Sequence, residues 1–236
     1  MKHVKEVSTV LSRAPLGLAA PLVRVEVHLG TGLPTFAMVG LPEAVVRESR
    51  ERVRAALLTA GFEFPVGRIT VNLSPADLPK EGGRFDLPIA IGILAASGEI
   101  PASALEQREF YGELSLGGEL RQTPKLLPAL IEGSRCGREL ILPFANAVEA
   151  RLVRDAKLKL ARDLRQVCNA LKGRHALPAP ACSVQAATPQ DEAAPAHLPA
   201  AQRPVPDLHE VRGQFAAKRA LEIAAAGEHG LLMSLH

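Results

Sequence analysis

Hydrophobic and polar residues alternate in two segments of the first part of the chain. In residues 22–29 every second position from Val23 onward is aliphatic, and the positions between carry charged or polar side chains. Residues 69–74 repeat the pattern with three alternate aliphatic residues. A period of two is typical of a strand that buries one face. We therefore predict two half-buried strands, with His28 on a solvated face.

Two longer segments predict helices. Residues 43–60 combine an apolar stripe with opposite charges four positions apart, which indicates a helix with one solvated face. Residues 87–96 carry no polar side chain, which predicts a buried helix, and Asp86 before them resembles a helix N-cap. We expect the short apolar segment 35–39 to form a hairpin with 22–29. Such a mixture of strands, hairpins and helices predicts an α+β fold of α/β layers.

The pattern is lost between residues 175 and 206, where proline and alanine dominate and apolar residues show no period. Such a composition predicts a disordered linker, because the segment has little apolar surface to bury. We therefore expect a first domain over residues 1–174 and the start of a second over 207–236. The second has too few residues to build a core, so we expect the chain to be a fragment of a longer protein.

Composition limits the possible functions. Aromatic residues make up 3% of the chain, with no tryptophan, so a surface for stacking nucleic-acid bases is poorly supplied. The net charge of +3 permits an acidic partner but is small for a dedicated nucleic-acid module. The three cysteines lack the spacing of a metal site and are expected to be reduced thiols. No segment approaches the ~20 apolar residues of a membrane span, and we expect no membrane partner and a cytoplasmic location.

A loop with two adjacent glycines, Gly82 and Gly83, connects the strand at 68–74 to the apolar helix. Unpaired backbone N–H groups and the helix dipole at such a junction can bind a ligand. An ordinary strand-to-helix connection has the same pattern, so both interpretations stay open. In the first, the loop is a polar surface for a subunit or nucleic-acid contact; in the second, its side chains are only solvated. The candidate surface residues are Lys80, Glu81, Gly82, Gly83, Arg84 and Asp86, with Arg50, Arg54 and Lys125 as weaker candidates.

Three segments resemble the YifB/ComM family, the magnesium-chelatase-like AAA+ ATPases: residues 12–96, 112–129 and 207–233. The most specific motifs are GLPEAVVRESRERVRAAL, at residues 40–57, and RITVNLSPADLPKEGGRFDLPIA, at residues 68–90. The resemblance covers essentially the whole chain. It implies a first domain with the fold of ribosomal protein S5 domain 2, which the Lon protease domain shares, followed by the first elements of an AAA+ motor.

The resemblance also implies a function. Full-length relatives are expected to bind ATP and Mg²⁺, to form homo-hexameric rings and to act on DNA, including branch migration in natural transformation. No GxxxxGK[ST] motif occurs in the 236 residues, so we expect this chain to lack nucleotide-binding and catalytic residues. We therefore expect it to be an accessory domain without cofactor or metal, with DNA and neighbouring subunits as partners.

Two alternative functions follow from related families. A Lon-like peptidase would need a serine activated by a lysine. The matching loop positions hold Arg84, Phe85 and Asp86, although Lys125 lies roughly where the partner lysine is expected. A regulatory subunit of a metal chelatase is suggested by the family's name, but the sequence has neither a porphyrin-pocket signature nor a metal cluster.

Overall fold

The computed structural model describes residues 7–39, 43–78, 80, 82–180, 213–227 and 229–232, with only the backbone for 43–47. Contacts divide the chain into two compact units, Met1–Val184 and Gln185–His236. The described part of the second unit contains helix α6 (Phe215–Ala226), none of whose residues is buried. Among the described residues, no helix is long and apolar enough to cross a membrane.

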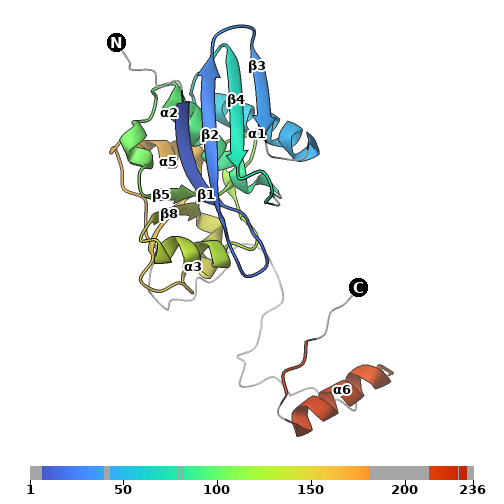
Figure 1. Ribbon diagram of the computed structural model, residues 1–236. Helices are drawn as coiled ribbons and strands as arrows, with labels where there is room; N and C mark the ends of the chain where they lie inside the picture. The colour runs from blue at the N-terminus through green and yellow to red at the C-terminus, as the bar shows by residue number, and fades with distance from the viewer. Residues whose placement is uncertain are drawn as a thin grey trace, which may run out of the picture. The chain divides into compact units, whose positions relative to one another are not determined.

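A mixed seven-stranded sheet forms the first unit, in the order β3-β4-β2-β1-β5-β8-β9 (Figure 1). β2 pairs antiparallel with both β1 and β4, and the other four neighbouring pairs are parallel. A small second sheet pairs β6 (Glu113–Leu114) with β7 (Leu120–Arg121). The strands of the large sheet are β1 (Val7–Arg13), β2 (Leu22–Gly30), β3 (Thr35–Val39), β4 (Arg68–Ser74), β5 (Arg108–Phe110), β8 (Glu139–Pro143) and β9 (Lys157–Ala161).

Two helices, α1 and α2, pack on one side of the β1-β2-β4-β3 part of this sheet (Figure 1). Single turns of 3₁₀-helix precede α2 and α4 and lie before β5. The helices are α1 (Glu43–Thr59), α2 (Asp86–Ala96), α3 (Leu127–Arg135), α4 (Ala147–Ala150) and α5 (Leu164–Leu171), and the 3₁₀ turns are Gly83–Phe85, Ala102–Leu105 and Phe144–Asn146.

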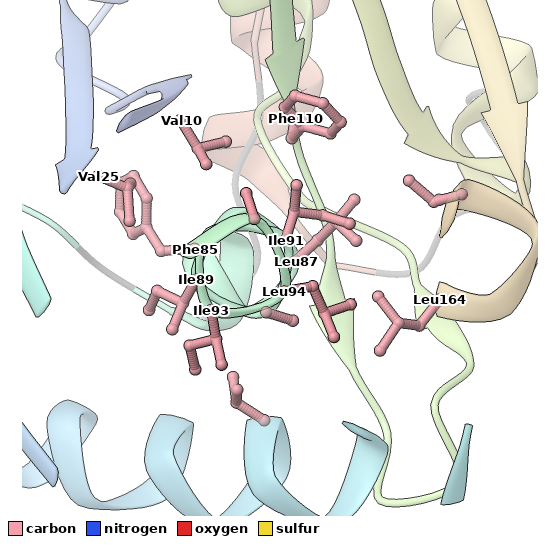
Figure 2. Packing of buried hydrophobic residues seen from close by; sticks show 14 of the residues in the cluster. Val10, Val25, Phe85, Leu87, Ile89, Ile91, Ile93, Leu94, Phe110 and Leu164 are labelled. Carbon is pink, nitrogen blue, oxygen red and sulfur yellow. The ribbon is translucent and has the colours of Figure 1, made fainter. Parts of the chain in front are cut away.

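Helix α2 is the centre of the core, because all of its residues are buried. Figure 2 shows apolar side chains around its whole circumference, toward Val10 and Val25 of the sheet, toward Phe110 and toward Leu164. At Gly92 the helix approaches the sheet so closely that a Cβ atom there would lie 2.6 Å from a methyl group of Val27. The predicted buried helix is therefore confirmed.

The two predicted half-buried strands are also confirmed, as β2 and β4, and His28 is exposed as expected. The predicted hairpin between 22–29 and 35–39 is wrong. β3 pairs in parallel with β4 instead, and β2 contacts the other side of β4. The physical reason is that helix α1 follows β3 and serves as the crossover that a parallel strand pair requires.

We predict that Ile91→Ala lowers the free energy of unfolding by about 2–5 kcal/mol, because it removes a fully buried side chain and leaves a cavity in the core. Val148→Ala is the control, since Val148 is 75% exposed and its truncation should cost less than about 0.5 kcal/mol. Denaturant unfolding of both variants measures the difference. Equal losses would contradict the central place of α2 in the core.

Candidate functional site

The glycine loop connects β4 to α2, and its lysine is directed inward. The side-chain nitrogen of Lys80 donates hydrogen bonds to the backbone oxygens of Pro75 and Leu78, the latter at 3.3 Å. Only 2% of the residue is exposed, and burial lowers the pKa of Lys80. The Lys80 side chain therefore stabilises the loop through hydrogen bonds to backbone oxygens of the same loop.

Arg84 and the two glycines make a second internal contact. The Arg84 guanidinium donates to the backbone oxygen of Pro124 at 2.6 Å, and only 5% of the residue is exposed. Gly82 has a left-handed φ of +71°, and a side chain at Gly83 would collide with Glu113. The cavity that remains between these residues measures about 70 Å³, which is room for a few water molecules only.

Asp86 is completely buried and accepts hydrogen bonds from two segments. Ser49 Oγ and Arg52 Nε of α1 each donate at 2.6 Å, and the backbone N–H of Leu114 donates at 3.2 Å. Burial raises the pKa of Asp86, and these donors oppose the shift. The predicted N-cap is wrong, because Phe85 occupies the cap position and Asp86 is the first helical residue. Its carboxylate instead connects α2 to α1 and β6 through these hydrogen bonds.

The predicted candidate residues are therefore close in space, but Lys80, Arg84 and Asp86 all have buried side chains. Glu81 lies outside the described residues. Binding of a partner by this loop stays a prediction, and the structure shows that three of its charged groups have internal partners.

Two of the weaker candidates, Arg50 and Arg54, lie together beside a groove of about 660 Å³. The groove lies between β3, α1 and the segment before β4. The Arg54 guanidinium carbon is 5.5 Å from the centre of the Phe64 ring, and Phe64 stacks on Phe36 with 6.4 Å between ring centres. Lys125 is exposed, has a φ of +54° and is not among the groove residues. The groove is lined by Pro34, Thr35, Phe36, Arg50, Arg54, Leu58, Glu63, Phe64, Pro65, Val66 and Gly67.

A second buried polar cluster surrounds Glu109, and sequence reasoning missed it. The Glu109 carboxylate accepts from Arg13 Nε at 2.9 Å, from an Arg138 nitrogen at 2.6 Å and from the Tyr111 hydroxyl. Burial and the neighbouring Glu109 carboxylate raise the pKa of Tyr111. Glu109 and Tyr111 are completely buried, so the cluster joins β1 and β5 inside the fold. No local pattern indicates it, because Arg13 and Glu109 are distant in sequence.

Metal and thiol chemistry receive little support from the described residues. None of their His, Cys, Asp and Glu side chains form a group of three that could hold a metal ion. Burial raises the pKa of the Cys168 thiol to about 12, whereas Cys136 is exposed. Cys182 lies outside the described residues.

The domain that contains the mixed sheet and the glycine loop belongs to the magnesium-chelatase ChlI class by its sequence match. Residues 25–146, which include the loop, match the family model for subunit ChlI of Mg-chelatase. Residues 207–235 match a second model, magnesium chelatase, subunit ChlI. Since the first match covers more than half of the chain, the class is established.

Similar individual proteins identify the family more closely than the ChlI models do. The chain is 49% identical over 223 residues to competence protein ComM of Haemophilus influenzae. It is 47% identical over 224 residues to the uncharacterized protein YifB of Salmonella typhimurium and 45% identical over 228 residues to that of Escherichia coli. These matches cover 94–96% of this chain but 42% of each relative. The chain belongs to the YifB/ComM family of magnesium-chelatase-like proteins, as its motifs predicted.

We predict that Arg52→Ala destabilises the fold, because it removes a charged partner of the buried Asp86 carboxylate. Breaking a buried pair costs about 3–5 kcal/mol. The Arg52 side chain is 19% exposed, so solvent screening should reduce the loss to about 2–3 kcal/mol. Arg50→Ala, two positions away, breaks an exposed pair with Glu51 and should cost less than about 0.5 kcal/mol. Chemical unfolding of both variants tests the difference, and similar losses would show that Asp86 does not depend on Arg52.

The raised pKa of Asp86 predicts a pH dependence. Below its ordinary value of 3.8 the carboxyl is protonated in both the folded and the unfolded chain. As the pH rises, the unfolded chain releases the proton first, so stability falls until the pH passes the folded-state pKa. Asp86→Asn lacks this titration. The free energy of unfolding of the wild type minus that of the variant should therefore decrease through this interval and then stay constant. An increase would mean that Arg52 and Ser49 lower the pKa.

Proposed function

We propose that this chain is the N-terminal accessory part of a YifB/ComM-type AAA+ ATPase that acts on DNA, and that it has no catalysis of its own. The observation that carries this proposal is the 49% identity to competence protein ComM over 94% of this chain. The chain spans 42% of that relative, so ATP and Mg²⁺ binding are proposed for the longer protein. The absence of GxxxxGK[ST] from the 236 residues supports a non-catalytic role for this part.

The proposed architecture is a domain like ribosomal protein S5 domain 2 and the Lon protease domain over residues 1–174. A linker over 175–206 and the start of an AAA+ domain over 207–236 follow. The second family match, at residues 207–235, supports the last of these assignments. In the proposed assembly, neighbouring subunits of a hexameric ring and DNA are the partners, and the cytoplasm is the location.

A Lon-like peptidase is the weaker alternative, and no contact of the described residues favours it. The loop positions that would need a nucleophile hold Arg84, Phe85 and Asp86. Arg84 and Asp86 are buried and hydrogen-bonded within the fold. Ser49, the hydroxyl that contacts Asp86, is itself only 2% exposed. A substrate would not reach this hydroxyl without opening the core.

A domain exchange tests the accessory role. The aligned part of Haemophilus influenzae ComM is replaced by this chain, and the exchange protein is produced in a strain that lacks its own ComM. We expect the transformation frequency to rise clearly above that of the deletion strain, because the two sequences are 49% identical over this part. Exchange proteins that carry Val148→Ala or Arg52→Ala are the controls, the first expected to restore transformation and the second to restore less. A stable, abundant exchange protein without restored transformation would refute the proposal.

A further inference from the structure

The two outer strands of the large sheet differ in how their free edges are protected. β9 carries Lys157 and Lys159, and the backbone N–H of Leu160 donates to the oxygen of Pro178 at 2.8 Å. Charged side chains and a covering segment are common protections against pairing with another chain. The β9 edge is therefore blocked by its own sequence and by the segment that follows α5.

β3, at the other end of the sheet, lacks both protections within the described residues. Its sequence, TFAMV, contains no charge and no proline, and β4 is its only described neighbour. The Thr35 N–H donates to the oxygen of Gly67 at 3.2 Å, which directs the backbone groups of Thr35 toward β4. Because backbone directions alternate along a strand, the N–H and C=O groups of Phe36 and Met38 point to the free edge. Figure 1 shows β3 as the outermost strand beside α1.

The groove described above is lined in part by Thr35 and Phe36 of β3, and we call it the β3 groove. Apolar side chains are exposed in it, with Val66 at 92% and Leu58 at 51%. Arg50 and Arg54 supply two positive charges, of which Arg50 is paired with the exposed Glu51 at 2.8 Å, and Glu63 supplies one negative charge. An uncharged strand edge beside exposed aliphatic and basic side chains matches an extended peptide with apolar and acidic residues.

We propose that the β3 edge and the β3 groove bind an extended acidic segment of a partner protein by strand addition. Backbone hydrogen bonds to Phe36 and Met38 would supply affinity. An apolar side chain would cover Val66 and Leu58, and carboxylates would pair with Arg50 and Arg54. This site goes beyond the proposed function and does not depend on it.

Two other partners fit the same surface less well. A single strand of nucleic acid has no peptide backbone to pair with β3, and the Phe64 ring already contacts Arg54 and Phe36. Few aromatic faces are therefore left for stacking bases. A second copy of this edge would bring the same two arginines, and like charges oppose such pairing.

A labelled synthetic peptide tests the proposal with the complete 236-residue chain. The probe is a short peptide in which serine alternates with glutamate or valine, so that the glutamate and valine side chains share one face of the strand. Fluorescence anisotropy measures its binding. We expect saturable binding that Arg50→Glu/Arg54→Glu weakens by about tenfold or more, because two attractive pairs become repulsive. The same variant should gain affinity for the matching peptide with lysine in place of glutamate. Arg151→Glu/Arg154→Glu, with the same change in net charge at exposed positions near α4, should bind like the wild type.

A second experiment tests the backbone hydrogen bonds between the peptide and β3. Peptides with N-methyl groups on all serines, or on all glutamates and valines, each lack one alternate set of N–H donors. Only one set faces β3 in a paired strand, so one methylated peptide should lose binding and the other should keep it. Equal binding of both would overturn strand addition.

Four further results would overturn the proposal. They are no peptide binding at low salt, equal weakening by the control variant, stronger binding of a labelled single-stranded oligonucleotide that the groove variant abolishes, and a dimer that this variant dissociates. The third would assign the groove to nucleic acid and the fourth to a second copy. Circular dichroism of each variant verifies the fold. Transformation by the exchange protein tests the proposed function separately, since it does not require this peptide to bind.

Discussion

Helix α2 has no solvated face, and the arrangement of the first unit follows from this constraint. Its N-terminal N–H groups lie inside the protein, where unpaired polar groups are costly. The Leu87 N–H donates to the oxygen of Gly112, and the Gly112 N–H donates to the oxygen of Arg84. The buried Asp86 carboxylate lies in the first turn, where the helix dipole favours a negative charge. The helix can be buried on every side because Gly112, between β5 and β6, accepts from its first turn and is itself bound to the loop before the helix.

The burial of α2 also accounts for the charged residues of the glycine loop. A loop of this kind before a helix can bind an anion, and that was one interpretation of its sequence. Here the chain supplies its own carboxylate, Asp86, and its own partners for that carboxylate, Ser49 and Arg52. A small cavity and a close approach of Gly83 to Glu113 leave little space for a ligand. The glycines and charged residues of the loop therefore have a structural role in the burial of α2.

Periodicity predicted the elements whose buried faces are apolar. β2, β4 and α2 belong to this group. β1 escaped prediction because its buried positions include Ser8, Ser12 and Arg13, while Val7 is exposed. Ser8 can be buried because its hydroxyl donates to the oxygen of Gly92 at 2.7 Å. β9 was missed although its lysines and leucines alternate.

The remaining features depend on contacts that no local pattern contains. The pairing of β3 with β4 depends on how α1 crosses between them, and the bond of Ser49 to Asp86 joins residues 37 positions apart. The position of the groove follows from these long-range contacts, since β3, α1 and the segment before β4 meet only after the crossover forms. The charged side chains of Lys80, Arg84 and Asp86 are buried and hydrogen-bonded within the fold. Arg50 and Arg54, in contrast, are exposed and line the β3 groove. For recognition of a partner, the physical argument therefore favours the sheet edge over the loop that the sequence made prominent.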